Sequence, residues 1–281
     1  MNKTKWEIAW EEARLKSSGR VRKQNEAAWE GYWDEVADEY LSDVIAGEPV
    51  YRAIVDHLTK QGAFRDGDSV LDIGCGPGTY ALLFAERARQ VDALDSSAAM
   101  LDAMLREAAH RGLDRLRPLQ AKWEELVPKD KYDLAFSAMS PAIKDSETLL
   151  KLETCSARSC CLVTYGENPD YGPINDLWGL IIGERPATSA FHYVYPYNLL
   201  LEINRKPTLD MFVLERAKQV TVDRLVRQYV TYFSIFTTID AHGERLIREY
   251  FEARSDVGLC EVKTHVRLAA ICWDVPGDPG P

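Results

Sequence analysis

Three alternating glycines are the clearest chemical feature of the sequence. Gly74, Gly76 and Gly78 follow an apolar run at residues 70–73, which predicts a buried strand, a tight turn and then a helix. Glycine accepts positive φ angles and lets a ligand lie against bare backbone, as a nucleotide-binding turn requires. Thr79, directly after the turn, is expected to cap the helix.

The turn departs from the dinucleotide fingerprint in its phosphate chemistry. The pattern G-x-G-x-x-G would need glycine where Thr79 stands. Pro77 also lacks a backbone N–H, which removes one donor from a phosphate site. Asp95 ends the next apolar stretch, and a carboxylate at this place can accept both hydroxyls of a ribose. These residues together favour a nucleoside ligand without a diphosphate.

This part of the chain resembles the class I S-adenosylmethionine-dependent methyltransferases, in particular the ubiquinone-biosynthesis-like (type 11) group. Residues 72–78 match the first motif of that family and residues 94–101 match the second, and the resemblance extends over residues 30–165. It implies S-adenosyl-L-methionine as the cofactor, S-adenosyl-L-homocysteine as the product, and direct methyl transfer to a small-molecule acceptor. In that family Asp72 lies near the amino end of the cofactor.

A helix is expected over residues 25–42, with an aromatic stripe on one face. Trp29, Trp33 and Tyr40 fall at positions i, i+4 and i+11. Residues 32–40 follow the aromatic-W-D-x-x-A-x-x-Y pattern of a helix that covers the bound cofactor in the resembled family. Trp33 and Tyr40 would then shield the methylsulfonium cation. The stripe is equally compatible with a packed core, and Trp29 is interpreted as core.

The adenine end departs from the family pattern. The family usually has Gly-Asp after the third strand, whereas this chain has Ala121-Lys122. Trp123 is a candidate to stack on adenine, with the backbone around Lys122 bonding the ring nitrogens. The analogy places Met100 beside the adenine, and a plain core position is the alternative. The cofactor-binding residues expected from these motifs are Trp33, Tyr40, Asp72, Gly74, Cys75, Gly76, Gly78, Asp95, Ser96, Met100, Lys122, Trp123, Ser137 and Met139.

The acceptor is expected to bind beyond the fifth strand. Residues 166–208 are dense in aromatic side chains, which suits an acceptor pocket, although a satellite hydrophobic cluster would have the same composition. The loop that contains Met139 should run past the methionine part of the cofactor. His192 is the candidate general base, because methylation of a hydroxyl or thiol benefits from proton removal. A structural histidine between aromatic residues is the alternative.

The motifs require an α/β fold. We expect a Rossmann-like, seven-stranded, mostly parallel sheet with helices on both faces, N-terminal helices and an insertion after strand 5. A helix is expected to begin at Pro49 and end at Gly62, and another to end at Gly112. The expected division is an N-terminal helical extension and lid at 1–45, a cofactor-binding core at 46–165, an acceptor side at 166–258, and a last strand and tail at 259–281.

Composition limits the partners. The 281 residues carry a net charge of −10, which disfavours nucleic acid as a partner. Six cysteines lack metal-ligand spacing, so no metal site is expected. Without a signal peptide or a long apolar segment, we expect a cytoplasmic protein that does not bind membranes. Residues 1–24 are interpreted as a partly ordered extension with a packed tryptophan. The alternative is a helix packed on the body or on a neighbouring subunit, which leaves a homodimer open.

Two other functions stay open. A non-catalytic S-adenosylmethionine-binding regulatory protein would keep the cofactor motifs, and the altered residues Ala121-Lys122 are compatible with it. A protein or RNA methyltransferase is disfavoured by the acidic net charge. Base or amide methylation is disfavoured further, because Ser140-Pro141 stands where such enzymes have an Asn/Asp-Pro-Pro-aromatic motif.

Overall fold

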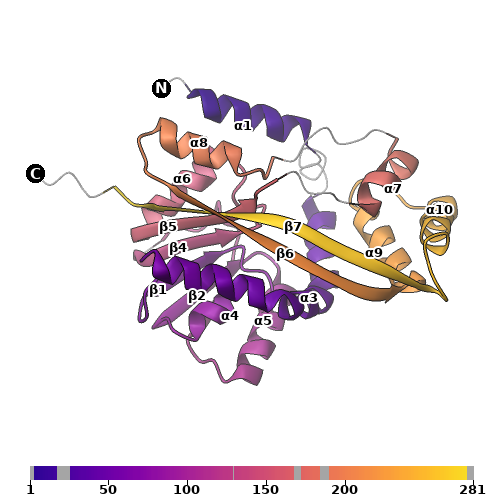
Figure 1. Ribbon diagram of the computed structural model, residues 1–281, viewed down its shortest axis with the longest axis horizontal. Coiled ribbons are helices and arrows are strands. Elements are labelled where there is room, and N and C mark those ends of the chain that lie inside the picture. Colours follow the sequence, from indigo (N-terminus) through magenta and orange to yellow (C-terminus); the bar gives the residue numbers. More distant parts are fainter. Residues whose placement is uncertain (1–2, 18–25, 129, 168–171, 184–189, 277–281) are drawn as a thin grey trace, which may run out of the picture.

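A seven-stranded sheet forms the centre of the protein (Figure 1). The computed structural model describes residues 3–17, 26–128, 130–167, 172–183 and 190–276. The strands are β1 (Ser69–Ile73), β2 (Gln90–Asp95), β3 (Leu116–Gln120), β4 (Tyr132–Ala138), β5 (Ser156–Tyr165), β6 (Thr208–Thr221) and β7 (Leu259–Asp274). Their order is β3-β2-β1-β4-β5-β7-β6, and β7 runs antiparallel to both of its neighbours. The Rossmann-like, mostly parallel sheet expected from the sequence is confirmed.

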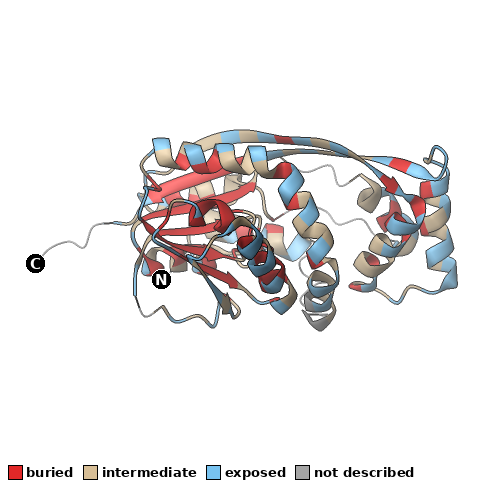
Figure 2. Cartoon of the chain, turned by 90° about the horizontal axis from the view of Figure 1, so that it is seen from below, coloured by how far each residue is buried: buried red, intermediate tan, exposed pale blue. Residues whose placement is uncertain are grey.

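Helices cover both faces of the sheet. Strand β1 alternates between the faces, with Val70 in one hydrophobic cluster and Leu71 in the other. The Val70 side packs against α3 (Glu26–Lys60), α4 (Ala81–Ala85) and α5 (Ala98–Arg111). The Leu71 side packs against α6 (Ser146–Cys155), α8 (Val194–Glu202) and α1 (Lys5–Lys16). Buried residues concentrate in the strands and on the inner faces of these helices (Figure 2).

Helix α1 docks on the same chain. Thr4 caps its first turn, and the indole N–H of Trp10 donates to the carbonyl of Ala190 at 3.0 Å. The backbone N–H groups of Lys5 and Trp6 donate to the Glu202 carboxylate at the end of α8. Of the two placements expected for this segment, the structure has the one on the body.

Helix α3 differs from the sequence prediction. A single helix replaces the two expected over residues 25–42 and from Pro49 to Gly62, and Pro49 lies inside it. Proline has no N–H to donate to the carbonyl four residues earlier and its ring crowds that turn, so such a residue bends a helix. The ribbon of α3 changes direction along its length in Figure 1. Packing against α5 and β6 keeps both halves helical.

Strands β6 and β7 extend past the sheet as a long hairpin. They pair along their whole length, from Thr208 opposite Cys272 to Thr221 opposite Leu259. The far end carries α7 (Pro173–Ile181), α9 (Val222–Ser234) and α10 (Ala241–Glu252), which share their own hydrophobic cluster (Figure 1). The expected segment 166–258 is therefore part sheet and part helical lobe.

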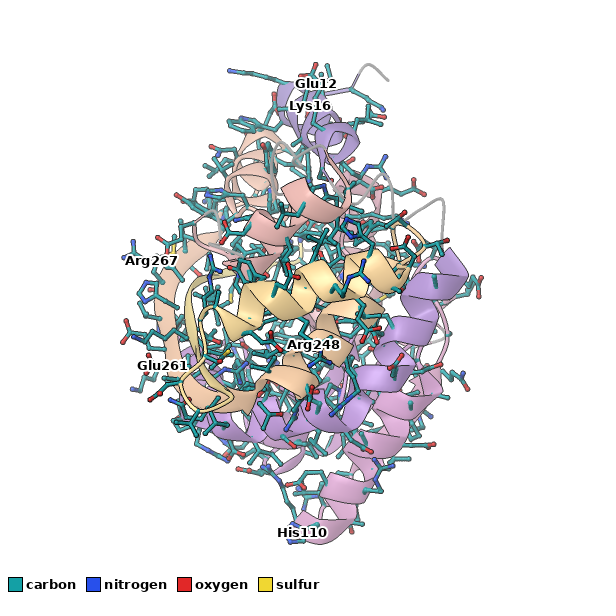
Figure 3. The ribbon with its side chains drawn as sticks, turned by 90° about the vertical axis from the view of Figure 1, so that its right-hand side faces the viewer. Glu12, Lys16, His110, Arg248, Glu261 and Arg267 are labelled. Atoms are coloured by element: carbon teal, nitrogen blue, oxygen red, sulfur yellow. The ribbon has the colours of Figure 1, made fainter. Side chains whose placement is uncertain are left out.

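Side chains alternate strictly along the hairpin. Between residues 261 and 267 the outward positions of β7 are charged or histidine, and Figure 3 shows Glu261 and Arg267 at the edge of the molecule. Thr264, Val266 and Leu268 point the other way, toward the cavity described below. Among the described residues, no helix combines the length and apolarity needed to cross a membrane.

Candidate cofactor site

The glycine turn joins the ends of β1 and β2. The N–H groups of Gly74 and Cys75 both donate to the carbonyl of Leu94, at 2.7 and 3.0 Å. Gly74 has a φ of 67°, and a Cβ on it would lie 1.8 Å from the Ser140 hydroxyl. Only glycine fits this close approach, because a side chain would displace the loop after β4.

The other two glycines have different surroundings. A Cβ on Gly76 would lie 3.6 Å from the Tyr40 ring, so this residue faces the aromatic helix across the cavity. A Cβ on Gly78 would lie 2.7 Å from Met104 and overlap Leu82, so Gly78 serves the packing of the turn on its own core. The following helix, α4, begins at Ala81 without a side-chain cap, so the capping role predicted for Thr79 is wrong.

Asp95 ends β2 beside this turn. Its Oδ2 accepts the Gly76 N–H at 2.8 Å, and its Oδ1 accepts the Ser97 N–H at 3.0 Å. Burial raises the pKa of the Asp95 carboxyl, and the backbone N–H donors oppose this effect. Each carboxylate oxygen keeps a further lone pair, so two ribose hydroxyls can still bind at the cavity.

Asp72 is the most deeply buried acid of the cavity lining. It is 2% exposed, and its Oδ2 has no hydrogen-bond partner. Burial, followed by repulsion from Asp95, raises the pKa of Asp72 to about 8, although the Ala81 N–H opposes the shift. A buried carboxylate oxygen without a partner favours a cationic or donating ligand group at this position.

The aromatic residues of α3 cover the turn. The rings of Trp33 and Tyr40 lie 5.8 Å apart, and both pack with Met100 of α5. The hydroxyl of Ser97, which caps α5, donates to Asp34 of α3 at 2.6 Å. This bond fastens the aromatic part of α3 to the end of β2.

The indole of Trp123 closes the end of the cavity beyond β3. It is 2% exposed, and its N–H donates to the Thr148 carbonyl at 3.0 Å. The Lys151 ammonium lies 4.5 Å from the ring centroid. One face of the indole is thus committed to the protein, and the residue also lines the cavity next to Lys122.

A cavity of about 580 Å³ unites these groups. The predicted cofactor-binding residues that line it are Trp33, Tyr40, Asp72, Gly74, Cys75, Gly76, Asp95, Ser96, Met100, Lys122, Trp123 and Met139. Residues that the sequence interpretation missed also line it, among them Tyr51, Tyr80, Tyr165, Arg216 and Thr264. In the described ranges no group of three or more acidic, histidine or cysteine side chains could hold a metal ion.

Three predicted site residues lie outside this cavity lining. Gly78 faces Met104, as described above. Ser137 is fully buried, and its hydroxyl donates to the Ile73 carbonyl at 2.8 Å, which ties β4 to β1. His192 stacks on Tyr193, and its Nδ1 accepts the Val194 N–H at 3.3 Å. Burial lowers the pKa of His192.

The segment that contains the glycine turn, Asp72 and Asp95 matches a known family of domains. Residues 70–154 match a family model described as a methyltransferase domain. This segment is therefore similar to a methyltransferase domain, and the match spans less than a third of the 281 residues. The match ends before β5, so the domain model covers β1 to α6 and leaves out α3 and the long hairpin.

Solved structures agree with this domain over a larger part of the chain. A DhpI–SAH complex is 16% identical, covers 89% of this chain and 97% of its own, and has a TM-score of 0.52. The YcgJ protein of Bacillus subtilis is 17% identical, covers 79% and 98%, and has a TM-score of 0.50. At these identities the likeness concerns the fold.

Two relatives are similar in sequence. An uncharacterized protein of Haemophilus influenzae is 27% identical over 135 residues, which are 47% of this chain and 48% of the relative. The malonyl-[acyl-carrier protein] O-methyltransferase of Serratia marcescens is 38% identical over 69 residues, 24% of this chain and 27% of the relative. The chain therefore matches about half of the first relative and about a quarter of the second.

Proposed function

We propose that the protein transfers a methyl group from S-adenosylmethionine to a small-molecule acceptor. The observation that carries the proposal is the single cavity that unites the glycine turn, Asp72, Asp95 and the aromatic cover from α3. The methyltransferase domain within residues 70–154 supports the same activity. The Serratia relative is named for O-methylation of a malonyl group, and DhpI was solved with SAH, so both fit a donor of this kind.

The residues present fit this cofactor. The unpartnered Asp72 oxygen suits the α-ammonium group of its amino-acid part. Asp95 is placed for the ribose hydroxyls, and Trp33 and Tyr40 offer π faces to a cation. Lys122 and Trp123 border the remaining end, where the adenine would lie without the acid that the family usually supplies.

The protein's contribution to the reaction is orientation and exclusion of water. The cofactor supplies an activated methyl group on a sulfonium, which a nucleophile can take by in-line displacement. The chain holds donor and acceptor in one cavity, so the reacting atoms meet at high effective concentration. Because His192 lies outside the cavity lining, we assign it no role as a base.

The domain division follows from this function. We assign residues 1–45 to the lid, 46–165 to cofactor binding, 166–258 to the acceptor side, and 259–281 to the last strand and tail. Strand β6 belongs to the acceptor side and also pairs in the central sheet. A small acceptor agrees with a cavity of about 580 Å³, which has the volume of a small-molecule site. We place the protein in the cytoplasm, where reduced thiols suit its free cysteines.

Two measurements test the proposal. Isothermal titration calorimetry with S-adenosylhomocysteine is expected to give one site per chain. Incubation of S-adenosylmethionine with a library of small acceptors is expected to produce S-adenosylhomocysteine for at least one of them. No binding at millimolar ligand would refute the proposal, and binding without turnover on any acceptor would favour a regulatory protein.

A further inference from the structure

We propose that Arg216, with the tyrosine hydroxyls near it, binds an oxyanion of the methyl acceptor, most simply a carboxylate. The inference rests on the proposed function and deepens it, because it names the chemical class of the acceptor. It concerns the end of the cavity formed by β6, β7 and the bend of α3.

Arg216 occupies an inward position of β6. Side chains alternate along this strand, so the face that carries Arg216 also carries the partly or fully buried apolar residues Phe212, Leu214 and Val220, together with the charged residues Asp210 and Lys218. The register places Arg216 opposite Thr264 on β7, and both residues line the cavity. Burial of a guanidinium on this face costs free energy unless the charge has partners. We therefore expect a ligand or an ion pair at Arg216.

The ion pair that Arg216 has is incomplete. Its Nη1 donates to the Asp43 carbonyl at 2.5 Å, whereas its Nη2 lies 3.4 Å from the Asp43 carboxylate. That carboxylate is held more closely by Lys218, at 2.6 Å. Two cations therefore share one acid, and the group keeps one net positive charge. Arginine has five N–H donors, so some remain for a ligand.

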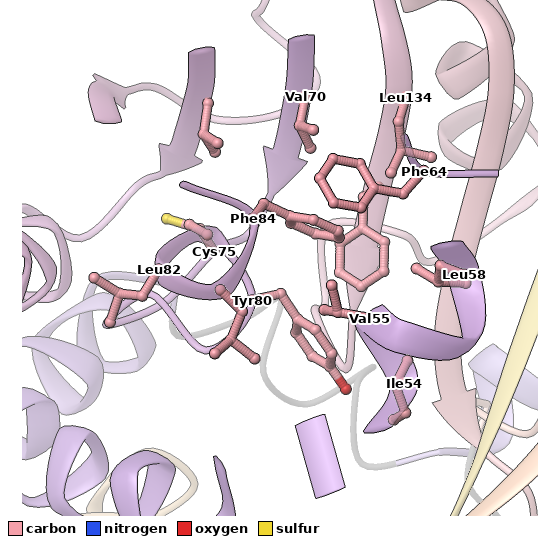
Figure 4. Close-up of a cluster of buried hydrophobic side chains, with 14 of the residues drawn as sticks. Ile54, Val55, Leu58, Phe64, Val70, Cys75, Tyr80, Leu82, Phe84 and Leu134 are labelled. Carbon is pink, nitrogen blue, oxygen red and sulfur yellow. The ribbon is translucent and has the colours of Figure 1, made fainter. Parts of the chain in front are cut away.

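Tyrosine hydroxyls complete the site. Tyr51 lines the same cavity as Arg216. Burial raises the pKa of the Tyr51 hydroxyl, and the positive charge of Arg216 partly offsets this effect. Tyr80 lies next to Tyr51, with ring centroids 5.4 Å apart. The Tyr80 hydroxyl is buried without any hydrogen-bond partner, and Figure 4 shows it directed away from Phe84. An unsatisfied buried hydroxyl that lines the same cavity as the Arg216 cation is available to an oxyanion.

The topology places this corner on the acceptor side. Arg216 enters from β6, the edge strand, whereas Asp95 lies on β2, near the opposite edge. Strands β4, β5 and β7 lie between β1 and β6 in the sheet, and Arg216 pairs with Thr264 on the part of β7 that extends past β5. A nucleoside on Asp95 and Trp123 would thus leave the β6 end for the second substrate.

The charged residues of the cavity lining also differ between its two ends. The lining acids Asp72, Asp95 and Glu124 lie toward the cofactor end, and the lining cations Lys144 and Arg14 are paired with Glu124 and Asp145. Near Arg216 the cavity lining includes the apolar residues Leu214 and Val266. A cation in a poorly hydrated apolar corner attracts an anion more strongly than one in water.

The test measures anion binding with matched probes. Phenylacetate and its neutral amide, phenylacetamide, are titrated by ligand-observed NMR into wild type, Arg216→Met and Lys218→Met, each with and without S-adenosylhomocysteine. Lys218 is the control because it shares Asp43 but does not line the cavity. Phenylacetate is expected to bind wild type and Lys218→Met, and to bind Arg216→Met about tenfold or more weakly. Phenylacetamide is expected to bind all three equally weakly.

Further outcomes separate this inference from the proposed function. Arg216→Lys should restore part of the phenylacetate affinity, and circular dichroism shows whether Arg216→Met is folded. Equal binding of amide and carboxylate by wild type overturns the inference. It is also overturned if Arg216→Met weakens S-adenosylhomocysteine and not phenylacetate, since Arg216 would then hold the donor's own carboxylate. If no variant binds S-adenosylhomocysteine, the proposed function fails, and the titration of free protein still decides the anion site.

Discussion

The Asp95 carboxylate accepts the Gly76 N–H at 2.8 Å, so the acid expected to bind the ribose also holds the glycine turn. The second oxygen of the same carboxylate accepts the N–H of Ser97, the residue that caps the N-terminus of α5. One side chain therefore fixes the relative positions of the β1 turn and the β2 end. Ligand binding and local order of the turn are coupled through Asp95.

Substitution of Asp95 by alanine is expected to weaken the binding of S-adenosylhomocysteine by about 10- to 100-fold, because two charge-assisted hydrogen bonds to the ribose hydroxyls are lost. It should also lower the free energy of unfolding by about 1–3 kcal/mol, because the Gly76 and Ser97 donors lose their acceptor. Titration calorimetry and urea unfolding measure the two effects. A folded Asp95→Ala protein that binds the ligand as wild type does would contradict the assignment.

Asp72 makes the free protein less stable as pH rises. The pKa of its carboxyl is about 8 in the folded state, against a usual value of 3.8. Between these values the folded state keeps a proton that the unfolded chain has lost. The contribution of this group therefore falls with rising pH, by about 1.4 kcal/mol per unit. It is fully favourable only below the unfolded pKa.

Asp72→Asn removes that dependence. Relative to wild type, the variant should gain about 2–3 kcal/mol of stability between pH 5.5 and 7.5, measured by urea unfolding at each pH. It should nevertheless bind S-adenosylhomocysteine more weakly, because the amide does not pair with an ammonium group. If the stability difference between the two proteins stays constant over this pH range, Asp72 does not titrate as described.

Cofactor binding is expected to release a proton below pH 8. A cationic group beside Asp72 favours the carboxylate and so lowers its pKa. Titration calorimetry of S-adenosylhomocysteine at pH 7, in buffers with different enthalpies of ionisation, measures the number of protons released. Wild type should release a fraction of a proton that disappears in Asp72→Asn.

The cofactor end could be predicted because its signals are local in sequence. The strand, turn, helix and second strand that present Asp72, the glycines and Asp95 all lie within residues 69–95. Short-range patterns of apolar residues and glycine determine these elements. The domain match over residues 70–154 covers the same region.

The other side of the cavity depends on contacts between distant segments. Arg216 interrupts the apolar alternation of β6, which nevertheless continues to Thr221. Tyr51 reaches the cavity because α3 continues through Pro49, where a helix start was expected. Packing against α5 and β6 overrides that local preference, and no periodicity in a single segment encodes it.

The bond between Ser97 and Asp34 is expected to set how long the aromatic cover stays closed. Asp34→Ala removes this anchor of α3, so S-adenosylhomocysteine should dissociate several-fold faster, as seen by stopped-flow tryptophan fluorescence. Asp38→Ala is the matched control, because Asp38 lies on the same helix and pairs with Arg106 of α5 at an exposed position. Equal release rates for both variants would exclude the anchoring role.

At position 139 we expect glycine to destabilise the protein less than alanine, which is the reverse of the usual order of these two substitutions. It lies at the end of β4 with a φ of 51°, and its N–H donates to the Val163 carbonyl at 2.8 Å. A side chain at this φ costs about 1 kcal/mol, whereas glycine adopts it freely. Met139→Gly should therefore unfold at equal or higher urea concentration than Met139→Ala. At Met100, inside α5, alanine should instead be the more stable of the two, because glycine weakens a helix. If alanine is also clearly better at position 139, the loop that carries Met139 does not hold this backbone conformation in solution.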